Sequence, residues 1–135
     1  MGLDMYAYVG EPGQMNEYFS AEGEYVDGDW RNKSGPSRPR DIAYWRKHPN
    51  LHGWMRQLWE SRGNEGDFNG DELELTWEDL DALEQAVVQA QLPTTGGFFF
   101  GDPNDSYYRE QDLEFIKNAR AELFSGLRVF YNSSW

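Results

Sequence analysis

A chain of 135 residues is long enough to bury the core of one domain and short for two. It contains no cysteine, which excludes disulfides, thiolate metal sites and a thiol nucleophile. Its net charge of −12 disfavours nonspecific binding to nucleic acid, because the phosphate backbone would be repelled. No stretch has the pattern of a signal peptide or a membrane span, so we expect a cytoplasmic protein without membrane contact.

The charge is unevenly distributed along the chain. Residues 1–30 contain seven acidic side chains and no Lys or Arg, which gives −7. Residues 31–62 contain eight basic and two acidic side chains, which gives +6, and residues 63–135 carry −11. An anion would therefore be attracted to the central third of the chain.

The first half of the chain predicts one strand, a long loop and one helix. LDMYAYV (3–9) is rich in strand-forming residues. Residues 11–30 are interrupted by Gly and Pro and predict loop, with one short strand around 24–26, and the polar segment 31–40 predicts a mobile loop. A helix is expected to begin at Asp41 as N-cap and to end before Pro49.

The second half predicts further helices and strands. We expect a helix capped by Asn50, a short strand at 72–76, and a helix that Thr76 and Asp79 cap. A short buried strand is expected at 94–101 and a final strand at 127–135.

Three helices have apolar residues at helical spacing. The buried positions are expected to be Leu51, Trp54, Met55 and Leu58, then Leu80, Leu83, Val87 and Ala90, and in a helix over 106–125 Ile116, Ala119, Leu123 and Leu127. The sequence therefore predicts a single α+β domain, with three to four helices packed on a small, mainly antiparallel sheet.

The stretch YWRKHPNLHGW (44–54) combines two cations, two histidines and three aromatic rings. Guanidinium groups bind phosphate or carboxylate, and rings stack on bases. This pattern predicts a binding site for a small anionic ligand; alternatively, the cations pair with acidic side chains and the rings fill the core. The candidate ligand-binding residues in this corner are Tyr44, Trp45, Arg46, Lys47, His52 and Trp54.

Metal and calcium sites are less well supported. His48 and His52 have the i, i+4 spacing of a shared metal site, but Pro49 interrupts the helix face between them. DFNGDELELTWE (67–78) resembles a calcium loop, yet Glu72 occupies the position where the turn needs glycine. We therefore expect no metal and no cofactor.

No catalytic arrangement stands out in the sequence. There is no G-x-S-x-G elbow, and the 24 acidic residues supply too many carboxylate pairs to identify one. The glycines after Thr94 and Thr95 favour either a backbone anion site or room for the three phenylalanines that follow. Catalytic residues are therefore not assigned.

Five short motifs occur together in this chain, namely GLDMY (2–6), AYWRK (43–47), LHGW (51–54), GFFFG (97–101) and SSW (133–135). With these motifs the chain resembles a family of small tailed-phage proteins. The resemblance implies a phage origin and activity in the host cytoplasm, and it adds Thr94, Phe99 and Trp135 to the candidate ligand-binding residues. Thr95, next to Thr94, is a further candidate. The name phosphoglycerate kinase, which is sometimes given to such proteins, does not suit this chain, because that enzyme has two lobes and is about three times longer.

Three functions are therefore considered. The first is a phage accessory protein that binds a small anionic ligand, such as a nucleotide or nucleotide signal, at the basic aromatic corner. The second is an interaction factor whose acidic surface docks on a basic host protein, in the manner of a nucleic-acid mimic. The third is an enzyme that acts on nucleotides or phosphoesters.

Overall fold

The computed structural model describes residues 2–20, 23–32, 38–89, 91–92 and 105–135. Four strands form an antiparallel sheet in the order β4-β1-β6-β5. Their bounds are Arg40–Arg46 for β4, Asp4–Gly10 for β1, Arg128–Ser134 for β6 and Leu73–Leu75 for β5. The chain is an α+β domain, as predicted.

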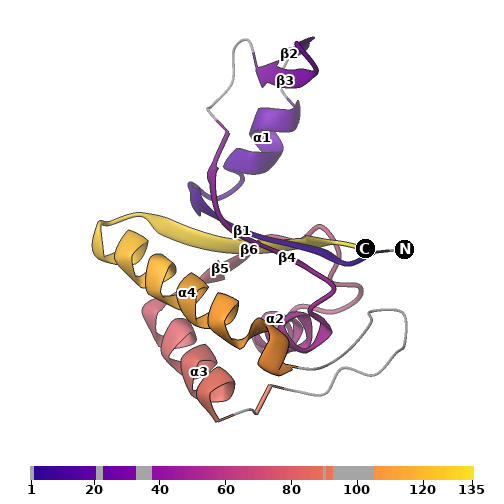
Figure 1. The fold of residues 1–135 in the computed structure, drawn as a ribbon. Coiled ribbons are helices and arrows are strands. Elements are labelled where there is room, and N and C mark those ends of the chain that lie inside the picture. The colour runs from indigo at the N-terminus through magenta and orange to yellow at the C-terminus, as the bar shows by residue number, and fades with distance from the viewer. Residues whose placement is uncertain (1, 21–22, 33–37, 90, 93–104) are drawn as a thin grey trace.

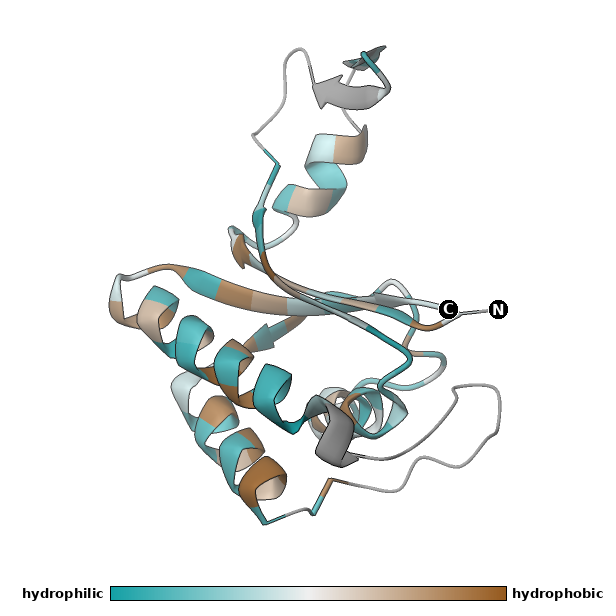
Figure 2. Ribbon diagram, in the orientation of Figure 1, coloured by the Kyte–Doolittle hydropathy of each residue, from teal (hydrophilic) through white to brown (hydrophobic). Residues whose placement is uncertain are grey.

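Three helices cover one face of this sheet, as Figure 1 shows. They are α2 (Pro49–Ser61), α3 (Trp77–Val88) and α4 (Asp105–Phe124). The strands alternate, so that Met5, Ala7 and Val9 of β1 point into the core between the sheet and these helices. Stripes of hydrophobic and hydrophilic residues run along the helices in Figure 2, as expected for helices that bury one side.

A separate arm projects from the opposite side of the sheet (Figure 1). It contains helix α1 (Gln14–Ser20) and the hairpin of β2 (Gly23–Val26) and β3 (Asp29–Asn32). Because Val9 of β1 pairs directly with Arg40 of β4, the whole arm is an excursion between two neighbouring strands. The face of the sheet on the arm's side is called the open face below.

Several predicted elements are confirmed. The strands at 3–9, 72–76 and 127–135 correspond to β1, β5 and β6. The Thr76 side chain accepts a hydrogen bond from the Asp79 N–H, and the Asp79 side chain accepts one from the Thr76 N–H, so the predicted capping pair is present.

The predicted helix stripes are mostly buried. Leu51, Met55, Leu80, Leu83, Val87, Ile116 and Ala119 lie in the core, with Trp54, Leu58 and Leu123 packed against it. Leu127 lies beyond the end of α4 and is 44% exposed, because Gly126 at φ 89° ends the helical segment before it. Ala90 and the expected strand at 94–101 fall outside the described residues.

Other predictions are wrong. The helix expected from Asp41 is strand β4, because Ile42, Tyr44 and Trp45 are strand formers that pair with β1. Helix α2 begins at Pro49 after His48, without a side-chain cap, so Asn50 is not its N-cap.

The strand expected around 24–26 is β2, so this part of the prediction is confirmed. The rest of the segment 11–40 was expected to be loop, yet it also contains helix α1 and strand β3, and Arg40 begins β4. Residues 31–32 of the expected mobile loop belong to β3, while residues 33–37 are outside the part that the structure describes. Asp27 (φ 53°) and Gly28 (φ 86°) form the two-residue turn, a pair of left-handed residues typical of tight hairpins.

Candidate functional site

The predicted basic aromatic corner is divided between two faces of the sheet. Tyr44 lies opposite Tyr6 on the open face, where the two rings are 5.3 Å apart. Its neighbour Trp45 lies opposite Met5 on the core face and is 1% exposed. Successive strand residues point to opposite sides, so two rings that adjoin in sequence cannot line one surface hollow.

A buried carboxylate holds Trp45 and His48 in the core. Asp112 of α4 accepts a hydrogen bond from Trp45 Nε1 at 3.0 Å, and its other oxygen lies 2.8 Å from His48 Nε2. The His48 ring stacks on Tyr108 at 4.1 Å, and the Tyr108 hydroxyl donates to the carbonyl oxygens of Arg46 and Lys47. These contacts anchor α4 to the corner, so His48 has an internal structural partner.

His52 is also a core residue. Its Nδ1 lies 2.8 Å from the Tyr131 hydroxyl, and its ring stacks on Phe68 at 5.3 Å. Burial, with a smaller contribution from the charge of Arg56, lowers the pKa of His52 to about 4. The ring is therefore neutral at pH 7, and Trp135 meets it edge-on at 6.5 Å.

The two cations of the corner remain at the surface. Arg46 and Lys47 are exposed, and neither forms an ion pair with a carboxylate of the described residues. The Lys47 backbone has φ 58° at the turn from β4 into α2, and its N–H donates to the Leu3 carbonyl at 2.8 Å. The Tyr44 hydroxyl donates to Asp4 at 2.7 Å.

The structure thus brings only some of the predicted site residues together at the surface. Tyr44, Arg46 and Lys47 are exposed, Trp45 and His52 are buried, and Trp54 is half-buried against the core. Trp135 lies by His52, with its indole N–H donating to the Phe68 carbonyl. Thr94, Thr95 and Phe99 lie outside the described residues.

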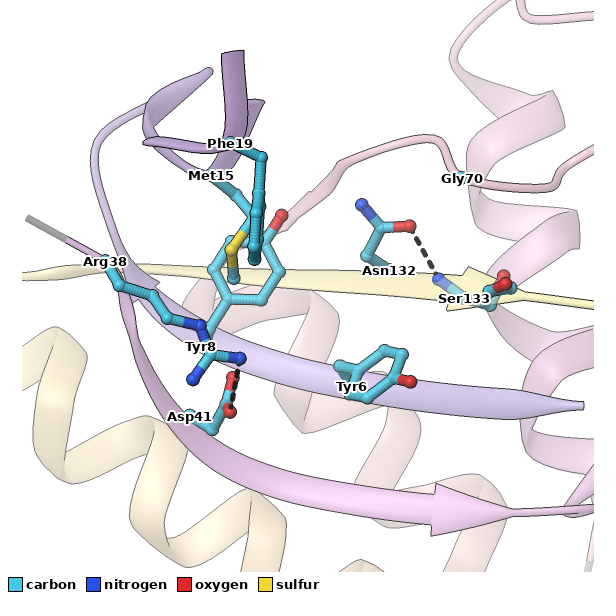
Figure 3. Close-up of a pocket in the computed structure, with 10 residues that line it drawn as sticks. Tyr6, Tyr8, Met15, Phe19, Arg38, Asp41, Gly70, Asn132 and Ser133 are labelled. Carbon is cyan, nitrogen blue, oxygen red and sulfur yellow. Dashed lines mark hydrogen bonds and ion pairs between the residues drawn. The ribbon is translucent and has the colours of Figure 1, made fainter. Parts of the chain in front are cut away.

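A hollow of about 310 Å³ lies on the open face, between the sheet and α1. Figure 3 shows Tyr6 and Tyr8 of β1 on the sheet side, with Met15 and Phe19 reaching toward them from α1. Its remaining walls come from Arg38 just before β4, from Asp41 within β4, from Gly70 and from the end of β6. It is called the open-face pocket below.

One carboxylate fixes the position of α1 over this pocket. Glu72, just before β5, accepts a hydrogen bond from the Tyr8 hydroxyl at 2.6 Å and another from the Gly13 N–H at 3.0 Å. Tyr8 stacks on Phe130 at 5.8 Å, and both rings are almost fully buried although they lie on the open face. Burial and the bond to Glu72 raise the pKa of Tyr8, so its hydroxyl stays protonated and keeps donating.

An ion pair stands at one end of the open-face pocket. Arg38 Nη2 lies 3.3 Å from Asp41 Oδ2, and both side chains are partly exposed. At the other end, Asn132 accepts a hydrogen bond from the Ser133 N–H at 2.7 Å, as the dashed line in Figure 3 shows.

The hydroxyl of Tyr6 also faces this pocket. No described residue forms a hydrogen bond with it. Partial burial and the carboxylates of Asp4 and Asp41 raise the pKa of Tyr6, so the hydroxyl is protonated at neutral pH and can donate to a ligand.

A second hollow, of about 290 Å³, lies between β4 and α4. The ion pair of Arg40 with Glu122 joins its two sides at 2.7 Å. None of the described residues that line it is aromatic, so it offers less for the recognition of a small molecule than the open-face pocket does.

The pocket residues were not among those predicted from the sequence, although two signals pointed to them. Alternation in LDMYAYV places Tyr6 and Tyr8 on the face opposite Met5 and Ala7. Met15, Tyr18 and Phe19 have the i, i+3, i+4 spacing of a helix that presents one apolar side. Nothing local in the sequence indicates that these two segments face each other.

Neither a metal centre nor a calcium loop emerges in the described part of the chain. No three His, Asp or Glu side chains converge there as metal ligands. In the calcium-like segment, Glu74 is bound by the guanidinium of Arg128, which lowers the pKa of that carboxyl. The segment leads into β5, which is the short strand expected at 72–76.

None of the described helices is both long and apolar enough to span a bilayer. The comparisons with known proteins add no relatives: no protein-family model, no curated protein and no solved structure matches this chain. The corner and the open-face pocket are therefore the two regions whose geometry bears on function.

Proposed function

We propose that this protein binds a small, ring-bearing molecule in the open-face pocket. The observation that carries the proposal is the gathering of Tyr6, Tyr8 and Phe19 around a hollow of about 310 Å³. Ligand sites are typically concave, largely apolar and furnished with a few polar groups that fix orientation. The pocket has this composition, with its polar groups at the two ends.

The proposal keeps the ligand-binding function expected from the sequence but gives it a different location. Rings and a cation were expected to meet at residues 44–54, and in the open-face pocket they meet through Tyr6, Tyr8 and Arg38. Arg38 is the one cation among the described residues that line this pocket. The lining residues include no histidine, so binding without turnover is the simplest function for the site.

The test is a titration with a panel of small ring compounds, namely nucleosides, indole-3-acetate and benzoate, followed by backbone amide NMR spectra. At least one compound should shift the amides of Tyr6, Gly70 and Ser134, which lie around the pocket. It should also raise the melting temperature, because a ligand that binds only the folded state stabilises it. A panel in which every compound leaves these amides unmoved would refute the proposal.

A pair of Phe→Ala variants shows whether the wall of the open-face pocket binds the ligand. Phe19 is 53% exposed and lines the pocket, whereas Phe124 is 88% exposed at the end of α4. Phe19→Ala should weaken binding about tenfold through lost stacking, and Phe124→Ala should leave it unchanged. Equal effects of the two substitutions would indicate nonspecific association with exposed rings.

The corner is a second proposed location for an anionic ligand. Arg46 and Lys47 are exposed there without a carboxylate partner among the described residues. Under this alternative the same titration would shift the amides of residues 44–48 in place of those around the pocket.

A docking function is the second candidate, and the arm favours it. The arm stands away from the sheet in Figure 1 and exposes the acidic side chains of Glu11, Glu17 and Asp27. A basic protein partner would be attracted to this charge in a salt-dependent manner. The resemblance to tailed-phage proteins makes the cytoplasm of a bacterial host the proposed setting for either function.

A further inference from the structure

We infer that the molecule bound in the open-face pocket carries a guanine-type edge, that is, a planar ring with adjacent N–H donors beside a carbonyl oxygen. The inference rests on the proposed function and specifies its ligand. Asp41 would accept from the N–H groups, and Arg38 would donate to the carbonyl oxygen.

The ion pair at the end of the pocket uses only some of the polar atoms of its two side chains, so the others can bind a ligand. A single contact joins Arg38 Nη2 to Asp41 Oδ2, and at 3.3 Å it is longer than a good charge-assisted hydrogen bond. Within the described chain, no other partner binds the second oxygen of Asp41 or the remaining N–H groups of Arg38. An acceptor and a donor therefore stand side by side at the pocket wall.

A free phosphate or carboxylate suits this end of the pocket less well. Arg38 is already paired, Asp41 would repel a second anion, and the chain as a whole carries −12. An N–H donor, by contrast, gains a charge-assisted hydrogen bond from the same carboxylate. The pocket is therefore better matched to an uncharged ring edge than to the anion expected from the sequence.

Among common heterocycles, guanine matches this pair most completely. Its N1–H and 2-amino group are neighbouring donors that one carboxylate can bind together, and its O6 is an acceptor beside them. Hypoxanthine lacks the 2-amino group and offers Asp41 one donor fewer. Adenine has no carbonyl oxygen for Arg38.

The rest of the pocket suits a flat ring. Tyr6 and Phe19 supply aromatic faces on which a base can stack, and stacking tolerates any base. Tyr8 is buried against Phe130 and contributes only to the lining. Selectivity among bases would then come from Arg38 and Asp41. The volume of about 310 Å³ lies at the lower end of the range for ligand sites, which favours a single nucleoside over a larger ligand.

The test is calorimetric titration of the full chain with guanosine, inosine and adenosine, in the native protein and in Asp41→Asn. In the native protein guanosine should bind about tenfold tighter than inosine, because the carboxylate holds one more donor. In Asp41→Asn the amide cannot accept from both donors, so the difference between guanosine and inosine should disappear. A role of Asp41 in folding alone would not change that ratio.

Asp81→Asn is the matched control, because it removes one carboxylate from the surface of α3 and changes the net charge equally. It should keep the native preference for guanosine. Equal binding of guanosine and inosine by the native protein would overturn the inference. If nucleosides fail while another ring compound shifts the pocket amides, this inference falls and the proposed function stands; if no compound shifts them, both fall.

Discussion

The corner at 44–54 and the open-face pocket contain similar residue types but use them differently. In the corner, Trp45, His48 and His52 are buried and held by internal hydrogen bonds, while the cations stay at the surface. In the pocket, rings from β1 and α1 surround a hollow, with an incomplete ion pair at its end. A dense group of rings and charges in the sequence therefore marks a structural anchor at one place, and spatially separate segments form the candidate site at another.

The largest difference between the two regions should appear in stability. Asp112→Ala leaves the buried Trp45 and His48 nitrogens without their shared carboxylate, so the free energy of unfolding should fall by about 3 kcal/mol or more. Asp41→Ala removes a partly exposed partner in the pocket and should cost less than about 1 kcal/mol. Urea unfolding of both variants measures the two values.

Similar losses in these two aspartate variants would contradict the assignment of the corner to the core. A loss of stability confined to Asp112→Ala would support that assignment, because of the two carboxylates Asp112 is enclosed and Asp41 is partly exposed. Binding should follow the opposite order, with the larger loss in Asp41→Ala.

Acid should lower the free energy of unfolding, because it protonates His52 in the core of the corner. Its pKa is about 4 in the folded protein and near 6.5 when unfolded, so the unfolded state binds more protons below pH 6.5. The stabilisation is complete above pH 6.5 and is lost as the pH falls toward 4, by up to about 3 kcal/mol. The measurement is the free energy of unfolding at several pH values.

The variant His52→Gln isolates this contribution. It lacks the titrating ring, so its stability should fall less than that of the native protein between pH 6.5 and 4. Parallel curves for the two proteins would show that His52 is not held neutral by burial. Glu74 and Glu84, whose pKa values are lowered by Arg128 and Arg120, contribute in a lower pH window, below their ordinary pKa.

The smallest expected effect on stability concerns Lys47, at the turn from β4 into α2. Lys47 has φ 58°, a left-handed conformation that costs an L-residue about 1 kcal/mol or more. Lys47→Gly removes that strain but adds freedom to the unfolded chain, so the net gain should be about 0.5 kcal/mol. Lys47→Ala keeps the strain, so it should be less stable than Lys47→Gly by the same amount, about 0.5 kcal/mol, in thermal unfolding.

Much of the fold follows from local patterns in the sequence. The alternation in LDMYAYV, the Thr76–Asp79 capping pair and the stripe of Leu80, Leu83 and Val87 each define an element without long-range information. Strand β4 was predicted as a helix because Asp41 resembles an N-cap, while its pairing with β1 depends on residues more than thirty positions away. Tertiary pairing outweighed the local signal there.

The arm shows which local signals were overlooked. Asp27 and Gly28, between Tyr25 and Trp30, are the residue pair most typical of a tight hairpin. The hairpin was therefore predictable. The open-face pocket was not, because the docking of α1 on the sheet depends on Glu72, which lies 59 residues from Gly13.

We propose that a ligand binds at the open-face pocket and not at the corner. Two matched variants distinguish these locations, namely Arg38→Ala in the pocket and Arg46→Ala in the corner, both of which remove an exposed guanidinium. Calorimetric titration with guanosine should show affinity about tenfold weaker in Arg38→Ala and unchanged in Arg46→Ala. Full affinity in Arg38→Ala with loss in Arg46→Ala would refute binding at the pocket and place the site at the corner.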